Sequence, residues 1–398
     1  MNNKFNYNHT IYACYIGYIT QAIVNNFVPL LFVTFQNSFD ITIEQIAFLV
    51  TMNFGIQLIV DALCGKLADK IGYKTSICIA HFFAAIGLIG LAIFPYLFSN
   101  AYTGIITAIA IYAIGGGLTE VLISPIVEGC PTEKKSAAMS ILHSFYMWGM
   151  VFVIIVSTIF FKLVGIENWR LLAILWSLIP AFNMFFFMFV PINKVTDEKE
   201  TISTRKLLSM KLFWLLSILM ICAGAAEQAM SQWASTFAEM GLNISKTAGD
   251  VAGPCMMAAL AGLARLLYGK FSDKVKLKRL MIISSMGAIV CYILVGSNIH
   301  PIISLAGCAL CGLFVGILWP GTFSIAAKEC VGGGTMLFAL LALFGDVGCA
   351  AGPAVVGFVS NAVGGNLSRG LLIAIIFPII MLIGLIMIPK SNKRKIVK

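Results

Sequence analysis

Residues 65–70 read Gly-Lys-Leu-Ala-Asp-Lys, and a close copy, Gly-Lys-Phe-Ser-Asp-Lys, occupies residues 269–274. Each copy follows an apolar run long enough to cross a bilayer, the second such run in its half of the chain. The one long polar interruption lies between them, at 191–210, and is rich in charges and short side chains. The repeat therefore predicts one structural unit used twice, at 1–190 and 211–398, with 191–210 as a cytoplasmic linker.

The composition is typical of an integral membrane protein. Of the 398 residues, 60% are hydrophobic and 11% are charged, against roughly 25% charged residues in soluble domains. Apolar runs of about 20 residues, the length that spans a hydrocarbon core, recur from end to end. This excludes a water-soluble fold and predicts an all-α protein with twelve transmembrane helices in two pseudo-symmetric six-helix bundles. The helices are predicted near 9–35, 43–65, 75–97, 101–124, 136–163, 169–190, 211–239, 246–268, 279–296, 301–327, 335–360 and 368–388.

The net charge of +10 is explained by topology. With both termini in the cytoplasm, most of the 27 Lys and Arg residues fall in the tails and cytoplasmic loops, whereas Lys162, Arg170, Lys246 and Arg369 fall outside. This asymmetry follows the positive-inside rule. It predicts a multi-pass protein of the cell membrane with cytoplasmic termini, and it explains the basic composition without a nucleic-acid partner. We expect a monomer in the lipid bilayer.

The sequence shows no pattern of an enzyme or of a cofactor site. Eleven cysteines are scattered through apolar runs, and the pair Cys308 and Cys311 has no second pair to complete a metal site. No nucleophile elbow, metal-ligand cluster or phosphate-cradling loop is found. We therefore expect no enzymatic activity, no cofactor and no bound metal.

Polar side chains inside the apolar runs indicate a substrate site, because a polar group that faces lipid is costly. Asn53, Gln57 and Asp61 recur every four residues and so share one helix face. The substrate-binding candidates are Gln21, Asn25, Asn26, Asn53, Gln57, His143, Tyr146, Glu227, Gln228, Gln232, Trp233 and Trp319. Packing between helices is an equal alternative for each amide and the more common role of a lone His, while Trp319 could be a membrane-interface residue.

Three carboxyl groups inside the spans are candidates for proton coupling. Glu120 follows three glycines and lies deep enough in its span to exchange protons. Glu227 lies in the seventh span beside amides and a tryptophan. Asp346 lies among small residues that would let a neighbouring helix approach closely, and a structural role with an unseen donor is an equal alternative for it.

The segment GKLADKIGYK, residues 65–74, resembles the Gly-x-Leu-Ala-Asp-Arg-x-Gly-Arg-Lys loop of the major facilitator superfamily. The resemblance covers the whole chain and implies two six-helix bundles around a central cavity that opens alternately to each side of the membrane. It also implies a gate that holds the cytoplasmic side shut; a solvated loop that only fixes topology is the alternative. The gate candidates are Gly65, Asp69, Lys70 and Gly72 in the first copy, and Arg265, Gly269 and Asp273 in the second.

Within this superfamily, three segments resemble the fucose-permease group of sugar:proton symporters. These are Asn25-Asn26, the stretch from Glu120 to Pro125, and Leu142-His143-Ser144-Phe145-Tyr146. The resemblance implies that Glu120 is the protonatable carboxyl. That group has an Asp shortly after the paired asparagines, where this chain has Pro29. Glu227 or Asp346 would then supply the second carboxyl, or transport would be uncoupled.

The function expected from these observations is proton-coupled uptake, by alternating access, of a small neutral polar solute such as a sugar. Amides, carboxylates and tryptophans suit hydroxyl groups and sugar rings. The alternative is proton-coupled efflux of a hydrophobic or cationic compound, with the carboxylates as counter-charges and the many Met and Phe residues as an adaptable lining. A solute sensor is a third reading. A basic residue in the middle of the cavity is not expected, which argues against an anionic substrate.

Overall fold

The computed structural model describes residues 5–131, 135–193, 204–271, 276–330 and 334–388. Within the helices, the side chains at 64–70, 128, 135–141, 143, 204, 269–271, 334–336 and 338 also lie outside the description. The elements are α1 (Tyr7–Asn26), η1 (Val28–Leu31), α2 (Phe32–Phe39), α3 (Ile43–Ile71), α4 (Tyr73–Leu97), α5 (Ala101–Glu128), α6 (Lys135–Val164), η2 (Ile166–Asn168), α7 (Trp169–Phe189), α8 (Thr204–Leu208), α9 (Lys211–Thr236), η3 (Phe237–Gly241), α10 (Lys246–Asp250), η4 (Val251–Cys255), α11 (Met256–Phe271), α12 (Leu277–Ser297), α13 (Pro301–Val315), α14 (Leu318–Glu329), α15 (Gly334–Ala362), α16 (Leu367–Ile373) and α17 (Ile376–Met387).

The twelve predicted helices are confirmed. The described residues contain twelve helical stretches that are long and apolar enough to cross a membrane. Most of their ends lie within three residues of the prediction; the first stretch, Tyr7–Phe39, is longer than predicted, and the apolar part of the fifth, Ser144–Val164, begins later. The fold class predicted from apolar run length is therefore correct.

The first span is interrupted, although the sequence predicts one continuous helix. It consists of α1, the 3₁₀ turn η1 and α2. Pro29, in η1, has no backbone N–H and so cannot continue the α-helical hydrogen bonds. The eighth span is likewise divided, with the π-helical turn η4 around Pro254 between α10 and α11. Both interruptions lie where the two halves meet, since η1 packs on α9 and η4 packs on α6.

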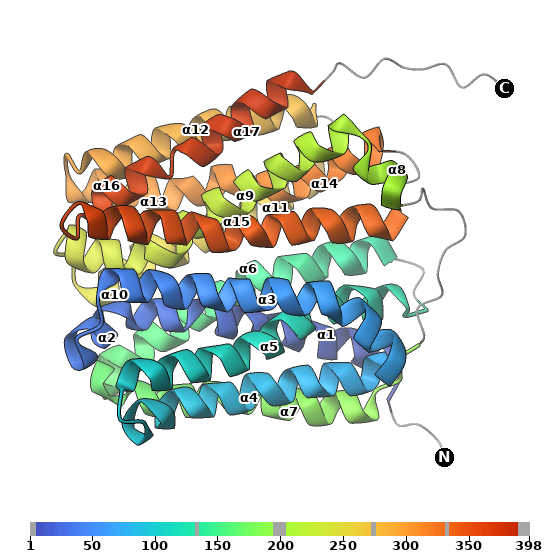
Figure 1. Ribbon diagram of the computed structural model, residues 1–398, viewed down its shortest axis with the longest axis horizontal. Coiled ribbons are helices and arrows are strands. Elements are labelled where there is room, and N and C mark those ends of the chain that lie inside the picture. The colour runs from blue at the N-terminus through green and yellow to red at the C-terminus, as the bar shows by residue number, and fades with distance from the viewer. Residues whose placement is uncertain (1–4, 132–134, 194–203, 272–275, 331–333, 389–398) are drawn as a thin grey trace.

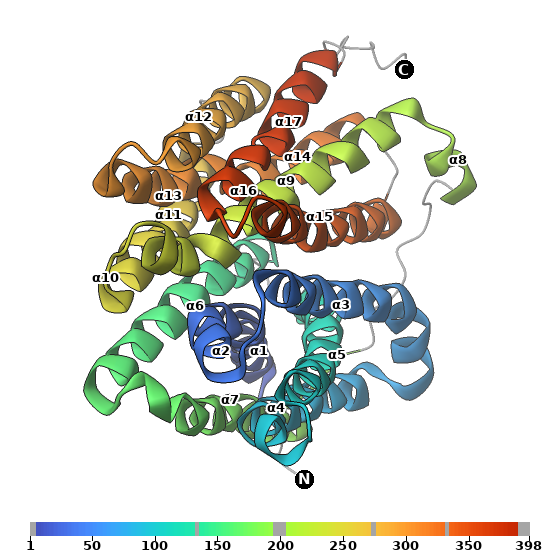
Figure 2. The ribbon, with the colours of Figure 1, turned by 60° about the vertical axis from the view of Figure 1, so that its left-hand side comes forward.

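The helices are arranged as two bundles. Figures 1 and 2 show α1 to α7 in one half and α9 to α17 in the other. The halves meet where α3 packs on α15 and α6 packs on α11. The start of α1, the short helix α8 and the end of α17 lie at one end of the molecule, which we call the termini end, whereas α2, α10 and α16 lie at the opposite end (Figure 1).

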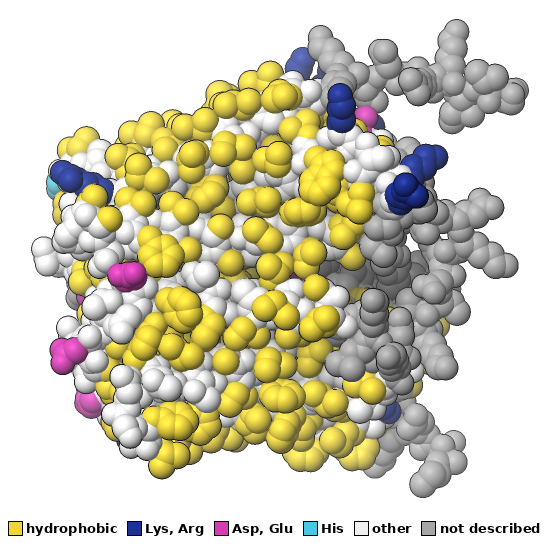
Figure 3. Space-filling model, in the orientation of Figure 1, with side chains coloured by type: hydrophobic (Ala, Val, Ile, Leu, Met, Phe, Trp, Pro, Cys, Tyr) yellow, Lys and Arg dark blue, Asp and Glu magenta, His cyan; other side chains and the backbone are white. Residues whose placement is uncertain are grey.

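The outer surface is apolar between these two ends. In Figure 3, hydrophobic side chains cover the middle of the visible face, and the Lys, Arg, Asp and Glu side chains lie near its two ends. Ile59, Leu63 and Phe182 are each at least 60% exposed. Large apolar side chains in such positions require lipid as the surrounding medium, so the chain is a multi-pass membrane protein.

The first copy of the repeated motif is helical, and the prediction of a loop there is wrong. Gly65, Asp69 and Lys70 belong to α3, which ends only where Gly72 adopts a φ of 89°. The intervening Lys-Leu-Ala residues favour a helix, and a glycine in the left-handed region ends one. The side chains of the first copy, and Asp273 entirely, lie outside the described residues, so the cytoplasmic gate stays a prediction.

Candidate functional site

Four amide side chains from the first two spans form a chain of hydrogen bonds in the N-terminal half. Gln21 Nε2 donates to Gln57 Oε1 at 2.8 Å. Gln57 Nε2 and Asn53 Nδ2 donate to the same oxygen, Asn25 Oδ1, at 2.8 and 3.1 Å. All four residues are buried. Asn53 and Gln57, four residues apart on α3, thus contact polar side chains of α1, as their shared helix face predicts.

The C-terminal half contributes to this chain from α9. Gln232 Nε2 donates to the backbone carbonyl of Asn25 at 3.1 Å and to Gln228 Oε1 at 3.1 Å. Tyr146, on α6, receives a long hydrogen bond of 3.5 Å from Asn25 Nδ2. Asn25 is therefore the residue at which groups from both halves converge.

Asn26 and His143 were also predicted to bind the substrate. Asn26 Nδ2 donates to the carbonyl of Ala22, one turn earlier in its own helix, and the Asn26 side chain also lies within hydrogen-bonding range of Tyr146. The side chain of His143 lies outside the described residues.

A small pocket lies beside Asn25, between α1, η1, α2, α3, α5 and α9. Its wall is mostly apolar, and its polar side chains include Asn25, Asn53 and Gln232. Asn53 Oδ1 is buried and has no hydrogen-bond partner. Because a buried acceptor without a donor is unfavourable, this atom is suited to bind a donor group of a ligand.

Three carboxyl groups from three helices come together next to the amide chain. Asp61 on α3, Glu120 on α5 and Asp346 on α15 each have a carboxyl oxygen within 4.8 Å of the others. Gln21 Nε2 donates to Glu120 Oε2 at 3.0 Å and so links the cluster to the amides. Asp61 and Asp346 lie within hydrogen-bonding range of each other although they belong to different halves. We call these three residues the carboxyl cluster.

The carboxyl cluster has no basic partner among the side chains that the structure describes. Three carboxyl oxygens at this spacing suit a hard cation or shared protons. We assign no metal to it, and the expectation that the protein binds none stays a prediction.

Glu227 is separate from this cluster and is paired with a base. Arg265 Nη2 lies 2.9 Å from Glu227 Oε2, and Arg265 Nε donates to the carbonyl of Gly316 at 3.0 Å. The described contacts of Arg265, which we predicted in the cytoplasmic gate, are thus with the middle of the C-terminal half. The expectation that no basic residue lies in the middle of the cavity is wrong, because Arg265 reaches Glu227 from α11. The pairing with Glu227 cancels the charge of Arg265.

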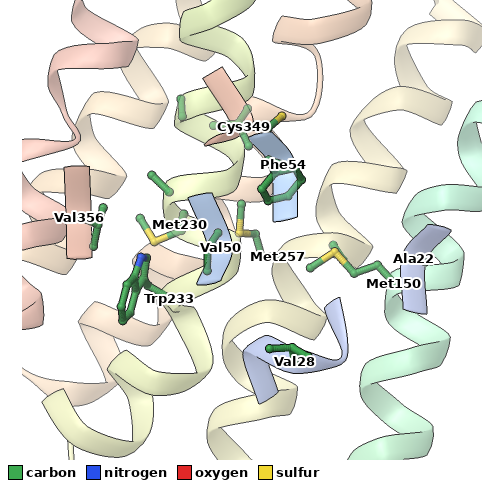
Figure 4. Close-up of a cluster of buried hydrophobic side chains, with 14 of the residues drawn as sticks. Ala22, Val28, Val50, Phe54, Met150, Met230, Trp233, Met257, Cys349 and Val356 are labelled. Carbon is green, nitrogen blue, oxygen red and sulfur yellow. The ribbon is translucent and has the colours of Figure 1, made fainter. Parts of the chain in front are cut away.

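A second small pocket lies beside Glu227 at the junction of the halves. It is lined by Met147 and Met150 from α6, by Met257 from α11, and by Ser231. Figure 4 shows Met150 and Met257 in this region. Thioether side chains give this pocket an adaptable, apolar wall that differs from the amide pocket.

The two predicted tryptophans occupy different surroundings. Trp233 is fully buried; its indole Nε1 donates to the carbonyl of Pro353 at 3.0 Å and its ring packs on Phe32. Figure 4 shows it among apolar side chains that include Met230 and Val356. Trp319 lies against Gly345, the neighbour of Asp346. Trp233 thus packs between the halves, whereas Trp319 lies near the carboxyl cluster.

At the opposite end, an ion pair within α10 makes hydrogen bonds to the N-terminal half. Lys246 Nζ lies 3.2 Å from Asp250 Oδ2 and donates to the carbonyl of Leu30, in η1, at 2.5 Å. Asp250 also accepts from Ser235, and from Thr158 Oγ1 of α6 at 3.4 Å. We call Lys246 and Asp250, with these partners, the clasp.

Sequence reasoning placed Asp61 on the polar face of its span but did not select it for proton coupling. The four-residue spacing from Gln57 was the signal that could have found it. It also missed the clasp, because Lys246 and Asp250 lie at the end of a span, where charges are common and carry little information.

Two bundles that share buried polar groups along their junction define a membrane transporter. A family model described as Major Facilitator Superfamily matches residues 14–353. The chain therefore belongs to the major facilitator superfamily.

Known proteins resemble the chain at low identity. The multi-drug resistance efflux pump PmrA of Streptococcus pneumoniae is 23% identical over 358 residues, which cover 87% of this chain and 88% of the pump. A D-xylose-proton symporter superposes with a TM-score of 0.76 at 12% identity over 96% of both chains. The fucose:proton symporter FucP of E. coli superposes with a TM-score of 0.67 at 17% identity over 96% of this chain and 98% of the symporter. At such identities, the structural likenesses establish the fold alone.

Proposed function

We propose that this protein is a secondary active transporter that moves a small neutral polar solute, such as a sugar, together with protons by alternating access. The observation that carries the proposal is the continuous set of hydrogen bonds from the amide pocket to the carboxyl cluster. It runs from Asn25 through Gln57 and Gln21 to Glu120. A solute that binds at one end of this path alters the donors available to the carboxylate at the other end.

The amides favour a neutral solute with hydroxyl groups. Asn25, Asn53 and Gln232 can each donate and accept, which suits a hydroxyl that does both. Their side chains carry no charge that would attract an ion, and the nearby Glu227 is neutralised by Arg265. The unpartnered oxygen of Asn53 supplies an acceptor for a solute hydroxyl.

The carboxyl cluster favours coupling to protons. Three ionised carboxylates with oxygens within 4.8 Å would repel each other strongly inside a bilayer. A bound proton removes one charge and allows Asp61 and Asp346 to share a hydrogen bond across the halves. We therefore infer that protonation holds α3 against α15, and that proton release loosens this contact so that the termini end can open.

We assign the termini end to the cytoplasmic side of the cell membrane, so that both termini lie in the cytoplasm. The basic residues of the tails and of the repeated motif support this orientation through the positive-inside rule. With this orientation, the predicted cytoplasmic gate residues Asp69 and Asp273 belong to the side that the carboxyl cluster controls, whereas Arg265 pairs with Glu227.

A second candidate function is proton-coupled efflux of a hydrophobic or cationic compound. The pocket lined by Met147, Met150 and Met257 favours it, since thioethers accommodate varied apolar groups. The likeness to a multi-drug efflux pump supports the same reading.

The test is transport into proteoliposomes with an imposed proton gradient, after a thermal-shift screen of sugars, polyols, nucleosides and lipophilic cations has found a ligand. The wild-type protein should accumulate the ligand, while Glu120→Gln should lose accumulation and keep solute exchange without a gradient. The control is Glu167→Gln, an exposed carboxyl, which should behave as wild type. Unchanged accumulation by Glu120→Gln would refute the role of this residue, and stabilisation by lipophilic cations alone would favour efflux.

A further inference from the structure

Pro29 leaves a backbone carbonyl of the first span without its usual partner. In a continuous α-helix, the N–H of residue 29 would bond to the carbonyl of Asn25, four residues earlier. Proline has no N–H, so this carbonyl is free for another donor. The carbonyl of Leu30 lies at the junction between η1 and α2, where the helical pattern changes.

Both carbonyls are bound by side chains of the other half. Gln232, on α9, donates to Asn25 at 3.1 Å. Lys246, on α10, donates to Leu30 at 2.5 Å. The interruption of the first span thus receives two donors from two elements of the C-terminal half.

We propose that Lys246 and Gln232 are the gate residues of the opposite end, and that they close it by binding the carbonyls exposed at the Pro29 interruption. The gate rests on the proposed alternating access, because this contact must break whenever the opposite end opens. It is distinct from the carboxyl cluster and from the cytoplasmic gate.

Asp250 holds the Lys246 side chain in place for this contact. Its carboxylate, fully buried, lies 3.2 Å from Lys246 Nζ on one oxygen and accepts from Ser235 on the other. The hydroxyl of Thr158, on α6, also donates to it. Asp250 therefore acts as a positioning residue that orients the ammonium group toward Leu30 and ties α10 to α6.

The gate also reaches the substrate site through Asn25. The Asn25 side chain accepts hydrogen bonds from Asn53 and Gln57, while its backbone carbonyl accepts from Gln232. Asn25 therefore accepts the closing hydrogen bond and also lines the amide pocket. Release of Gln232 leaves Asn25 free to move with α1, so opening the gate changes the shape of the site.

The test measures how readily a buried cysteine at this junction reacts with a membrane-impermeant maleimide in intact cells. The probe is Ala47→Cys, placed in a chain whose native cysteines have been replaced. Ala47 is fully buried and contacts Gly357 across the halves at the opposite end. Because the experiment reads exposure and not transport, it remains informative if proton coupling or the substrate class is wrong.

Lys246→Met should raise the labelling rate about tenfold, because a hydrogen bond to a charged group is worth enough to shift a two-state equilibrium by that factor. Pro29→Ala, which restores the N–H that competes for the Asn25 carbonyl, and Gln232→Leu should raise it less. Lys246→Arg should keep labelling low, since a guanidinium can also donate to Leu30 and pair with Asp250. Lys162→Met, an exposed lysine at the same end, is the matched control and should have no effect.

Unchanged labelling in both Lys246→Met and Gln232→Leu, in proteins that keep a cooperative thermal transition, would overturn the proposal. Equal labelling of Lys246→Met and Lys246→Arg would also overturn it, because the contact would then depend on packing and not on the donor. A rise in the control Lys162→Met would show that loss of any charge at this end exposes the probe, which again contradicts a specific gate.

Discussion

The two halves are joined by contacts of opposite electrostatic character at different depths of the molecule. In the clasp, at the opposite end, the charge of Lys246 is balanced by Asp250 and shared with a backbone carbonyl. In the carboxyl cluster, closer to the termini end, Asp61 faces Asp346 with Glu120 beside them, and no described base compensates them. The charges of the clasp are compensated without a bound proton, whereas the carboxyl cluster needs a proton to reduce its repulsion.

This difference explains how the binding of one proton can determine which end of the protein opens. The hydrogen bonds of the clasp across the halves, from Lys246 to Leu30 and from Thr158 to Asp250, keep the same strength while Lys246 and Asp250 stay charged. The carboxyl cluster attracts or repels according to its protonation, so its contribution changes sign. We infer that pH acts on the termini end through the carboxyl cluster.

The largest effect is expected where a buried charge loses its only ionic partner. Arg265→Met leaves Glu227 buried and unpaired, and should lower the free energy of unfolding by about 3–5 kcal/mol. Arg279→Met, at an exposed arginine, should change it by about 0.5 kcal/mol or less. Thermal unfolding in one detergent compares the two variants. Equal transition temperatures for them would show that the Glu227–Arg265 pair is dispensable.

A smaller loss is expected in the clasp. Asp250→Asn removes the charge that holds Lys246 but keeps an acceptor for Ser235, so it should cost about 1.5–3 kcal/mol. The control, Asp40→Asn, changes an exposed residue with φ of 52°, a conformation that Asn tolerates. Unfolding by denaturant measures both. A loss no larger than that of Asp40→Asn at neutral pH would show that Asp250 does not hold Lys246.

The smallest effect, with the opposite sign, is expected in the carboxyl cluster. Asp61→Asn removes one of three mutually repelling groups, so stability should stay the same or rise by about 1 kcal/mol. The rise should be largest in alkaline buffer, where the wild-type carboxyls release protons. A loss of stability as large as that of Asp250→Asn would mean that Asp61 takes part in a compensated contact and not in a repelling one.

The sequence predicted the fold and the amide part of the site because both rest on local patterns. Apolar run length is a property of neighbouring residues, and the four-residue spacing of Asn53 and Gln57 fixes one helix face. The meeting of this face with Gln21 and Asn25 follows from adjacent spans packing together.

The contacts between the halves could not be predicted in this way. Asp61 and Asp346 are 285 positions apart, and nothing local in either span indicates the other. The same holds for Arg265, whose position one turn before the repeated motif suggested a cytoplasmic partner, while its side chain turns back toward Glu227. Pro29 was noted as a missing carboxyl, but the carbonyl that it frees is visible only once α9 is in place.

The central claim is that protonation of the carboxyl cluster closes the termini end. The most direct measurement is the distance between spin labels at Met188→Cys and Met387→Cys, two exposed positions near that end in α7 and α17, in a chain without native cysteines. A change from alkaline to acidic buffer should shorten this distance in the otherwise unchanged protein and leave it constant when Asp61→Asn and Asp346→Asn are added. A distance that does not respond to pH, or one that still responds in the doubly substituted protein, would contradict the claim.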